Sequence, residues 1–589
     1  MRTLVLVCLA ATATACAHHD DGHGDDSLAT LSINPPTSDL TVLNTTPATE
    51  DFTATLTFPD GSTEDVTSTS QFSVTVGYGD FLAQTLTARG AGKMTVLGVY
   101  KDKQASAEVV VHAQGTRVDP SLPANTPDLF TGAETIATAP AIVYPAENVV
   151  MPRNLGDFEI HWTDASPNDI WEISLHTDLS DMRVYVPGKN GLASIGPSAS
   201  YQAFLSTEWA AAVGSEATVT YQVRGVQSAN PGAGVGAAPP RLVKLTNEEM
   251  NGGIYYWASA GDDANSPEGI WRHDMAKPGE PAEQFETLVQ TTSADYPNGR
   301  CIACHTLSRD GAHMVVTWDG GDGASSTVDV GTKTVSASGA DAWNFSTFTP
   351  DGNTLLTVHD GVLVVRDYAS LAVLASPTFG GMVSHPDLSP DGTQLVYVRR
   401  PTTDPVQSDW SFTAGQIWTR SFDASTNTFG PETMLVSDSS NNYYPSYSPD
   451  GKWVLFNKAS ADSYNDVDAT VYVVKADGTA APIQLAQLNT GASLTNSWAR
   501  WAPFQQTVGT ESIYWITVSS QRNFGVRIDQ AARVAAMQGK RPQIWMAAFV
   551  PSVADVNMDP TQPSFRLPFQ NITTNNHIAQ WTERVVVTQ

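Results

Sequence analysis

Three stretches in the second half of the chain repeat one pattern: Phe348-Thr349-Pro350-Asp351-Gly352, Leu388-Ser389-Pro390-Asp391-Gly392 and Tyr447-Ser448-Pro449-Asp450-Gly451. A fourth, Leu307-Ser308-Arg309-Asp310-Gly311, has arginine in place of proline. Two of the three intervals between successive Asp-Gly turns are roughly 40 residues long. Each turn lies between two short apolar stretches; Thr393–Val398, for example, follows Asp391-Gly392. Roughly 40 residues holding four short strands make one blade of a β-propeller. The repeat therefore predicts an all-β propeller.

The pattern resembles the TolB-like, WD-type propeller repeat, and the resemblance covers residues 249–589. Blades are expected to start near Cys301, Trp343, Ser384, Tyr443 and Asn496. Residues 252–275 carry outer-blade strands without an inner one, and residues 577–587 form an inner strand with no blade after it. The two ends are expected to complete one blade, which gives six blades and leaves no open edge.

The stretch Cys301-Ile302-Ala303-Cys304-His305 has the spacing of covalent c-type haem attachment. Two thiols would bond the haem vinyl groups, and the imidazole of His305 would bind the iron. The chain has four cysteines, and the other two, Cys8 and Cys16, lie in the N-terminal segment. Cofactor binding by Cys301 and Cys304 is therefore one interpretation, and an exported c-type cytochrome with an electron-transfer or haem redox role is the function it implies.

The repeat also places a ring of side chains. Residues six before each turn Asp are expected beside the central channel at one mouth: Cys304, Phe345, His385, Tyr444 and, by weaker alignment, Trp498 and a residue near His577. A second axial ligand would come from this neighbourhood. His577 is the first candidate, His385 the second and Met382 the third. An open sixth position would favour small-ligand binding or peroxidase-like chemistry instead.

A second interpretation remains open. Cys301 and Cys304 could form a disulfide or a redox-active dithiol, and the chain would then be a non-enzymatic surface lipoprotein whose propeller binds protein or glycan. The sequence has no Gly-x-Ser-x-Gly elbow, phosphate loop or His-Glu-x-x-His motif. Whether the protein is an enzyme by other chemistry is left open. Two acidic stretches, 319–323 and 462–468, could bind calcium, but their spacing does not match an EF-hand.

Residues 1–16 have the features of a signal peptide, with Arg2 before a short apolar run. Ala13-Thr14-Ala15-Cys16 resembles a bacterial lipobox, which implies lipidation of Cys16, and Ala17 after it resembles an outer-membrane address. An ordinary cleaved secretory signal is the alternative. Residues 17–27, rich in His and Asp, are expected to be a solvated tether.

Two β-sandwich domains are expected before the propeller. Residues 28–113 resemble a bacterial Ig-like domain of group 2, on Asp60-Gly61-Ser62-Thr63, Asp65-Val66-Thr67 and Phe72-Ser73. Residues 114–141 are expected to be a linker. Residues 142–248 resemble a fibronectin type III or Ig-like sandwich with Trp162 and Trp171 in its core, and His161 is expected on its strand surface.

The net charge of −29 argues against nucleic acid or anionic membrane surfaces as partners. Membrane contact is expected only through a lipid anchor, in an outer-membrane, cell-surface or periplasmic protein. The redox or envelope partner is not specified by the sequence.

Overall fold

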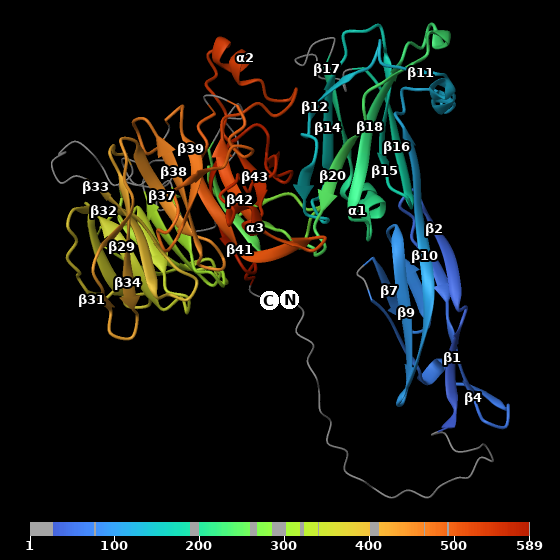
Figure 1. Cartoon of the computed structure of the whole chain (residues 1–589), viewed down its shortest axis with the longest axis horizontal. Coiled ribbons are helices and arrows are strands. Elements are labelled where there is room, and N and C mark those ends of the chain that lie inside the picture. Colours follow the sequence, from blue (N-terminus) through green and yellow to red (C-terminus); the bar gives the residue numbers. More distant parts are fainter. Residues whose placement is uncertain are drawn as a thin grey trace, which may run out of the picture. The chain divides into compact units, whose positions relative to one another are not determined.

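The computed structural model describes residues 28–75, 78–188, 199–259, 268–285, 302–318, 323–339, 341–400, 411–464, 466–491 and 494–587. Strands hold 52% of the residues and helices 6%, so the all-β class is confirmed. Contacts divide the chain into two compact units, drawn in Figure 1. The first unit comprises the residues up to Thr41, Pro47–Ala88 and Lys93–Val111, and the second holds the rest. No helix among the described residues has the length and apolar character needed to cross a membrane.

The first unit is built from short antiparallel strands: β1 (Thr30–Asn34), β2 (Thr37–Leu43), β3 (Ala48–Asp51), β4 (Thr53–Thr57), β5 (Thr63–Asp65), β6 (Gln71–Val74), β7 (Gly79–Leu82), β8 (Thr85–Ala88), β9 (Gly92–Tyr100) and β10 (Lys103–Val118), with a 3-10 turn at Thr67–Thr69. They form the sheets β1-β4-β5 and β3-β8-β7, and the run β6-β9-β10, with β2 on β10. In β4 the apolar Ala54 and Leu56 alternate with threonines, and both are fully buried. This period-2 pattern explains why the segment is a strand with one face on the core.

The second unit begins with a further set of strands: β11 (Glu134–Thr135), β12 (Ala141–Tyr144), β13 (Val149–Met151), β14 (Phe158–Thr163), β15 (Ile170–His176), β16 (Ser180–Pro187), β17 (Ala199–Phe204), β18 (Thr218–Val226), β19 (Val235–Ala237) and β20 (Arg241–Leu245), together with α1 (Ser206–Val213) and 3-10 turns at Thr126–Thr131 and Pro231–Ala233. Ala113–Val118 of β10 pairs in parallel with β16, so residues 114–118 belong to this sheet. Trp162 and Trp171 are buried with ring centroids 6.1 Å apart, as expected of core residues.

The expectation for His161 was wrong. Its side chain is fully buried, its ring lies 4.7 Å from that of Phe524, and its Nε2 lies 2.9 Å from Oε2 of Glu159. Strand alternation alone places His161 on the opposite face from its neighbours, but it cannot show that another part of the chain covers that face.

Six antiparallel sheets make up the rest of the second unit. They are β45-β21-β22-β23, β24 to β27, β28 to β31, β32 to β36, β37 to β40 and β41 to β44. Their strands are β21 (Gly253–Ser259), β22 (Gly269–Asp274), β23 (Glu283–Gln284), β24 (Ile302–Leu307), β25 (His313–Trp318), β26 (Ser325–Asp329), β27 (Thr334–Ser338), β28 (Phe345–Phe348), β29 (Thr354–His359), β30 (Val362–Asp367), β31 (Val373–Ala375), β32 (Met382–Leu388), β33 (Gln394–Arg400), β34 (Gln416–Asp423), β35 (Thr428–Phe429), β36 (Thr433–Val436), β37 (Asn441–Tyr447), β38 (Trp453–Ala459), β39 (Thr470–Lys475), β40 (Ile483–Gln484), β41 (Ser497–Val508), β42 (Glu511–Ser520), β43 (Gln543–Phe549), β44 (Phe565–Arg566) and β45 (Asn575–Thr582).

Two short helices, α2 (Gln530–Ala535) and α3 (Pro551–Ala554), flank β43. The expected pairing of the two ends is present: β45 pairs antiparallel with β21, from Gly253 opposite Thr582 to Ser259 opposite Asn575. One strand from the end of the chain therefore completes a sheet that begins more than 300 residues earlier. The chain is a β-propeller protein, and its innermost strands β24, β28, β32, β37, β41 and β45 position the site described next.

The Asp-Gly turns are held by one repeated set of hydrogen bonds. In the turn at residues 388–392, Oγ of Ser389 donates to the carboxylate of Asp391 at 2.5 Å. The same carboxylate accepts the N–H of Thr393 at 3.0 Å, and the N–H of Gly392 donates to the carbonyl of Ser389 at 2.8 Å. Gly392 has φ +72°, a conformation that glycine adopts without steric cost. The Ser, Asp and Gly of the motif thus each have a physical role in the turn.

Candidate functional site

Four innermost strands break their register at one equivalent position. His385, Tyr444, Trp498 and Ile578 have φ values of 45°, 49°, 58° and 59°, and in each strand the pairing with the neighbouring strand shifts there. A β-bulge of this kind redirects a side chain from the sheet face. The repeated bulge identifies Ile578 as the residue near His577 that completes the equivalent set.

The expected ring of aromatic residues packs together as a layer. We call Phe345, His385, Tyr444 and Trp498 the aromatic layer. Ring centroids lie 4.1 Å apart for Phe345 and His385, 4.0 Å for His385 and Tyr444, and 4.2 Å for Tyr444 and Trp498, the last pair being stacked. All four side chains are buried. The layer unites residues from four sheets and is about as well packed as a protein core.

His385 uses one ring nitrogen inside this layer. Its Nδ1 accepts the backbone N–H of Tyr444 at 3.3 Å, so the proton of the neutral ring resides on Nε2. Burial, with the guanidinium groups of Arg500 and Arg400 nearby, holds the pKa of His385 well below its ordinary value. This engagement leaves His385 less suited to bind iron than the sequence ranking suggested. The third candidate, Met382, packs against Gly361.

Cys304 and His305 lie on β24, whereas Cys301 lies outside the described residues. Burial raises the pKa of Tyr444 and of Tyr464, and a negative charge on Cys304 acts in the same direction on both phenols. His305 is buried, with Nε2 3.5 Å from the carbonyl of Tyr255 on the adjoining sheet. Cys304 therefore borders the aromatic layer, and His305 is turned toward the sheet that contains β45.

His577, the first-ranked second ligand, lies on β45, which contacts the strand β24 that carries His305. Burial, and a smaller effect of charge on His305, lower the pKa of His577 to about 4. Its ring meets Trp257 edge to face with centroids 4.8 Å apart, and Trp498 at 6.4 Å. The structure thus brings His305 and His577 together from sequence positions 272 residues apart.

A cavity of about 330 Å³ opens next to His577. We call it the His577 cavity. Its lining residues are Ser259, Tyr464, Thr495, Ser497, Trp498, Ser519, Gln521, Pro542, Asn575 and His577. Its lining combines the aromatic rings of Tyr464, Trp498 and His577 with small polar side chains such as Ser259 and Thr495.

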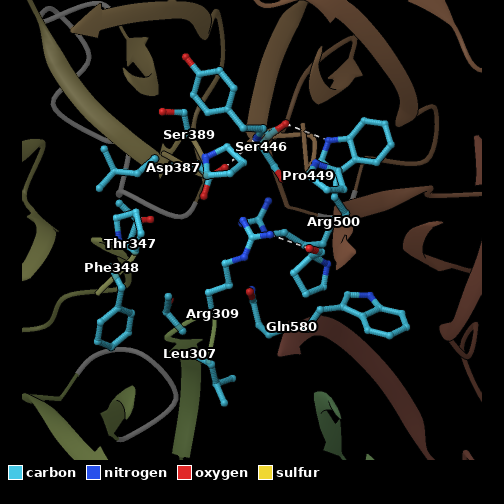
Figure 2. A pocket seen from close by; sticks show the side chains of 18 of the residues that line it. Leu307, Arg309, Thr347, Phe348, Asp387, Ser389, Ser446, Pro449, Arg500 and Gln580 are labelled. Carbon is cyan, nitrogen blue, oxygen red and sulfur yellow. Dashed lines mark hydrogen bonds between the residues drawn. The ribbon is translucent and has the colours of Figure 1, made fainter. Parts of the chain in front are cut away.

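A second cavity, which we call the Arg500 cavity, lies one or more residues further along the same innermost strands. It is lined by side chains from all six, including Thr306, Ser346, Asp387, Ser446, Arg500 and Gln580. Figure 2 shows Arg309, Asp387, Arg500 and Gln580 around its opening. Sequence reasoning did not single out any of these residues. The signal was the chain position two residues after each bulge, where Asp387, Ser446, Arg500 and Gln580 all stand.

The acidic stretch around Asp466 uses its carboxylates within its own loop. Asp466 accepts the backbone N–H groups of Ala461 and Asp462 at 2.8 and 3.1 Å, and Asp468 accepts that of Ser460 at 3.0 Å. In the part of the chain that the structure describes, no group of three or more His, Cys, Asp or Glu residues is arranged to hold a metal ion. The other acidic stretch, 319–322, and the lipidation candidate Cys16 lie outside the described residues.

No protein-family model and no curated protein matches the chain. Among solved structures, the chain is similar to TolB from Agrobacterium tumefaciens at 13% identity over 54% of this chain and 89% of that one, with a TM-score of 0.31. TolB from Acinetobacter baumannii gives 14% identity over 62% and 79%, with a TM-score of 0.36. Dihydro-haem d1 dehydrogenase NirN gives 13% identity over 51% and 61%, with a TM-score of 0.28. Such values concern the propeller fold and carry no argument about function.

Proposed function

We propose that the chain is an exported, c-type cytochrome-like propeller protein of the cell envelope, with a covalent haem attached through Cys301 and Cys304 at the mouth of the His577 cavity. His305 and His577 are the iron ligands in this proposal. One observation carries it: His305, directly after Cys304, lies on a strand in contact with β45, and β45 places the half-buried His577 in the lining of the His577 cavity.

The protonation of the two histidines suits iron ligation. A ligating imidazole must offer a lone pair, so it must be neutral. His577, with a pKa of about 4, is neutral throughout the physiological range. The contact of His305 Nε2 with the carbonyl of Tyr255 is long at 3.5 Å, so exchanging it for another partner costs little.

The neighbouring side chains fit a flat, apolar group. Trp498 and Tyr464 meet edge to face with centroids 5.6 Å apart, and both line the cavity. Trp257 holds the ring of His577 from the side, and its indole N–H donates to the carbonyl of Ile302 at 2.8 Å. When bound, a haem iron supplies one-electron redox chemistry. The chain's own residues would orient the group, exclude water from one of its faces and fix the imidazole of His577.

The remaining parts of the proposal concern the scaffold. The six sheets form six blades around one channel, the first compact unit is an Ig-like sandwich, and residues 142–248 form a second sandwich. Cys16 anchors the mature protein to the outer membrane through lipid.

The test is maturation in a bacterial host that exports proteins and ligates haem. The purified chain should show covalent haem in a pyridine haemochrome spectrum, and Cys301→Ser with Cys304→Ser should lose it. His577→Ala should change the visible spectrum of the iron. His273→Ala is the matched control, because His273 is also buried in the β45-β21-β22-β23 sheet with a pKa of about 4 but lies at the opposite end of it.

Two results of the same experiment would contradict parts of the haem proposal. A colourless protein from that host, with Cys301 and Cys304 joined in a disulfide, overturns the haem proposal. It leaves the second interpretation, a non-enzymatic lipoprotein that binds protein or glycan through its propeller. An unchanged spectrum in His577→Ala removes His577 as a ligand while leaving the attachment in place.

A further inference from the structure

The Arg500 cavity is separate from the His577 cavity. The two share no lining residue. Two residues beyond His385, Tyr444 and Trp498 along their strands stand Asp387, Ser446 and Arg500, so the aromatic layer lies between the two cavities. The Arg500 cavity measures about 160 Å³. A ligand in the Arg500 cavity would therefore occupy a space separate from the His577 cavity.

Arg500 brings a positive charge into this cavity without a close negative partner. Its guanidinium carbon lies 5.8 Å from the centre of the Tyr444 ring, and one of its N–H groups donates to the carbonyl of Ala499 at 3.2 Å. Among the residues that the structure describes, no carboxylate lies within ion-pair distance of it. Arg500 is half-buried, and a partly desolvated guanidinium without an ion pair is stabilised by a bound anion.

The nearby Asp387 compensates for Arg500 only in part. One carboxylate oxygen of Asp387 accepts the N–H of Tyr447 at 2.8 Å. Burial raises the pKa of Asp387 to about 6, although Arg500, that hydrogen bond and Arg309 act in the opposite direction. Asp387 therefore loses its negative charge in mildly acidic solution, while Arg500 keeps its positive charge.

Further polar groups in the cavity are available to a ligand. The hydroxyl of Ser346 is buried and has no hydrogen-bond partner among the described residues. Gln580 contributes an amide from β45. Arg309, by contrast, is already engaged, by Glu583 at 2.6 Å and the carbonyl of Pro503 at 2.7 Å. The hydroxyl of Ser346 and the amide of Gln580 can donate hydrogen bonds in the same cavity as the guanidinium of Arg500, and a planar carboxylate accepts bonds from such groups.

We propose that the Arg500 cavity is a binding site for a small carboxylate anion, with the guanidinium of Arg500 as its main recognition group. The volume admits a molecule of a few heavy atoms, such as a short-chain monocarboxylate. Asp387 repels this ligand when ionised, so binding is stronger when Asp387 is protonated. The site gives the propeller a function in addition to any chemistry at Cys304.

Calorimetric titration of the full chain with acetate and pyruvate, at constant ionic strength set with chloride, tests the proposal. Binding should strengthen about threefold or more from about pH 7.5 to about pH 5.5, as Asp387 takes up its proton. Arg500→Gln should weaken binding at least about tenfold, because a charge-assisted hydrogen bond is lost. Arg309→Gln, the matched control, should change binding much less, because Arg309 is engaged elsewhere.

Asp387→Asn gives an independent test that does not remove Arg500 and so applies even if Arg500→Gln does not fold. This variant should bind acetate more tightly than the natural chain at about pH 7.5 and should lose the pH dependence. The proposal is overturned if the natural chain binds neither carboxylate at either pH, if Asp387→Asn weakens binding, or if a folded Arg500→Gln binds as before. Binding of tetramethylammonium in place of the carboxylates would also overturn it.

Discussion

The backbone N–H of Tyr444 donates a hydrogen bond of 3.3 Å to Nδ1 of His385. The bond joins two neighbouring innermost strands at the residues where each strand bulges. It fixes the tautomer of the buried imidazole and links adjacent blades within the aromatic layer. His385 therefore contributes as a neutral hydrogen-bond acceptor, and its replacement has a pH signature.

His385→Phe should lower the free energy of unfolding by about 1 kcal/mol near neutral pH, because the N–H of Tyr444 loses its acceptor. The pKa of His385 in the folded chain lies below that of the unfolded chain. Its contribution to stability is then complete above the unfolded pKa, about 6.5, and decreases as pH falls through that value. Urea unfolding from about pH 8 to about pH 5 should show a steeper loss in the natural chain than in His385→Phe. Equal slopes would contradict the assignment.

Tyr444→Phe should be neutral or stabilising. The Tyr444 hydroxyl is buried and has no hydrogen-bond partner among the described residues, so its removal abolishes a desolvation cost. Tyr443→Phe is the matched comparison, because the Tyr443 hydroxyl lies 3.4 Å from Oγ of Ser497. That variant should cost up to about 1 kcal/mol in urea unfolding. A larger loss for Tyr444→Phe than for Tyr443→Phe would show that the Tyr444 hydroxyl has a partner.

Asp387→Asn should stabilise the chain at neutral pH and not in acid. The pKa of Asp387, about 6, is higher than in the unfolded chain, where it is about 3.9. The folded state then binds the proton more tightly than the unfolded state does. The stability that protonated Asp387 contributes is therefore complete below the unfolded pKa and is lost as pH rises through 6. We expect the free energy of unfolding of Asp387→Asn to exceed that of the natural chain by about 1–2 kcal/mol at about pH 8, and this difference should disappear near pH 4. Chemical denaturation at both pH values measures it, and a pH-independent difference would refute the shifted pKa.

Gly392→Ala should cost more than Gly451→Ala. Both glycines have φ +72° in the same turn motif, so the backbone strain is matched. A Cβ on Gly392 would lie 2.8 Å from Cδ of Pro350 in the preceding blade, whereas on Gly451 the nearest atom, Cδ of Pro390, would be at 3.6 Å. We expect Gly451→Ala to lower the free energy of unfolding by about 1 kcal/mol, and Gly392→Ala to lower it by about 1–3 kcal/mol more. Thermal or urea unfolding of the two variants decides this, and equal losses would show that the blades separate to admit the methyl group.

The repeated turns made the propeller predictable because their chemistry is local. Ser389, Asp391 and Gly392 determine the turn through contacts within a few residues, and the apolar strands on either side follow from alternation. The offset of six residues from the turn Asp then placed Phe345, His385 and Tyr444 in one layer, since equivalent positions in repeated blades face the same axis, and a weaker alignment added Trp498. The pairing of the chain ends followed from the same logic, because an unpaired inner strand needs a partner.

Other features depend on residues that the sequence keeps far apart. The burial of His161 depends on Phe524, more than 360 residues later. The charge balance of the Arg500 cavity depends on Asp387 and Arg500 coming from different sheets. Neither can be inferred from spacing along the chain, because the relevant distance is set by the packing of sheets around the channel.

The sequence by itself determined the turn motif, the all-β class, the closing strand and the presence of Cys301, Cys304 and His305 at haem spacing. Each of these is a short-range property of residue type and interval. Tertiary structure alone decided that the strand of His577 contacts the strand of His305, that His385 is committed to Tyr444, and that no carboxylate among the described residues lies within ion-pair distance of Arg500 in its cavity. The physical reason is that burial and neighbouring charge set the pKa and the free hydrogen-bonding capacity of a side chain, and both arise only when separate strands pack together.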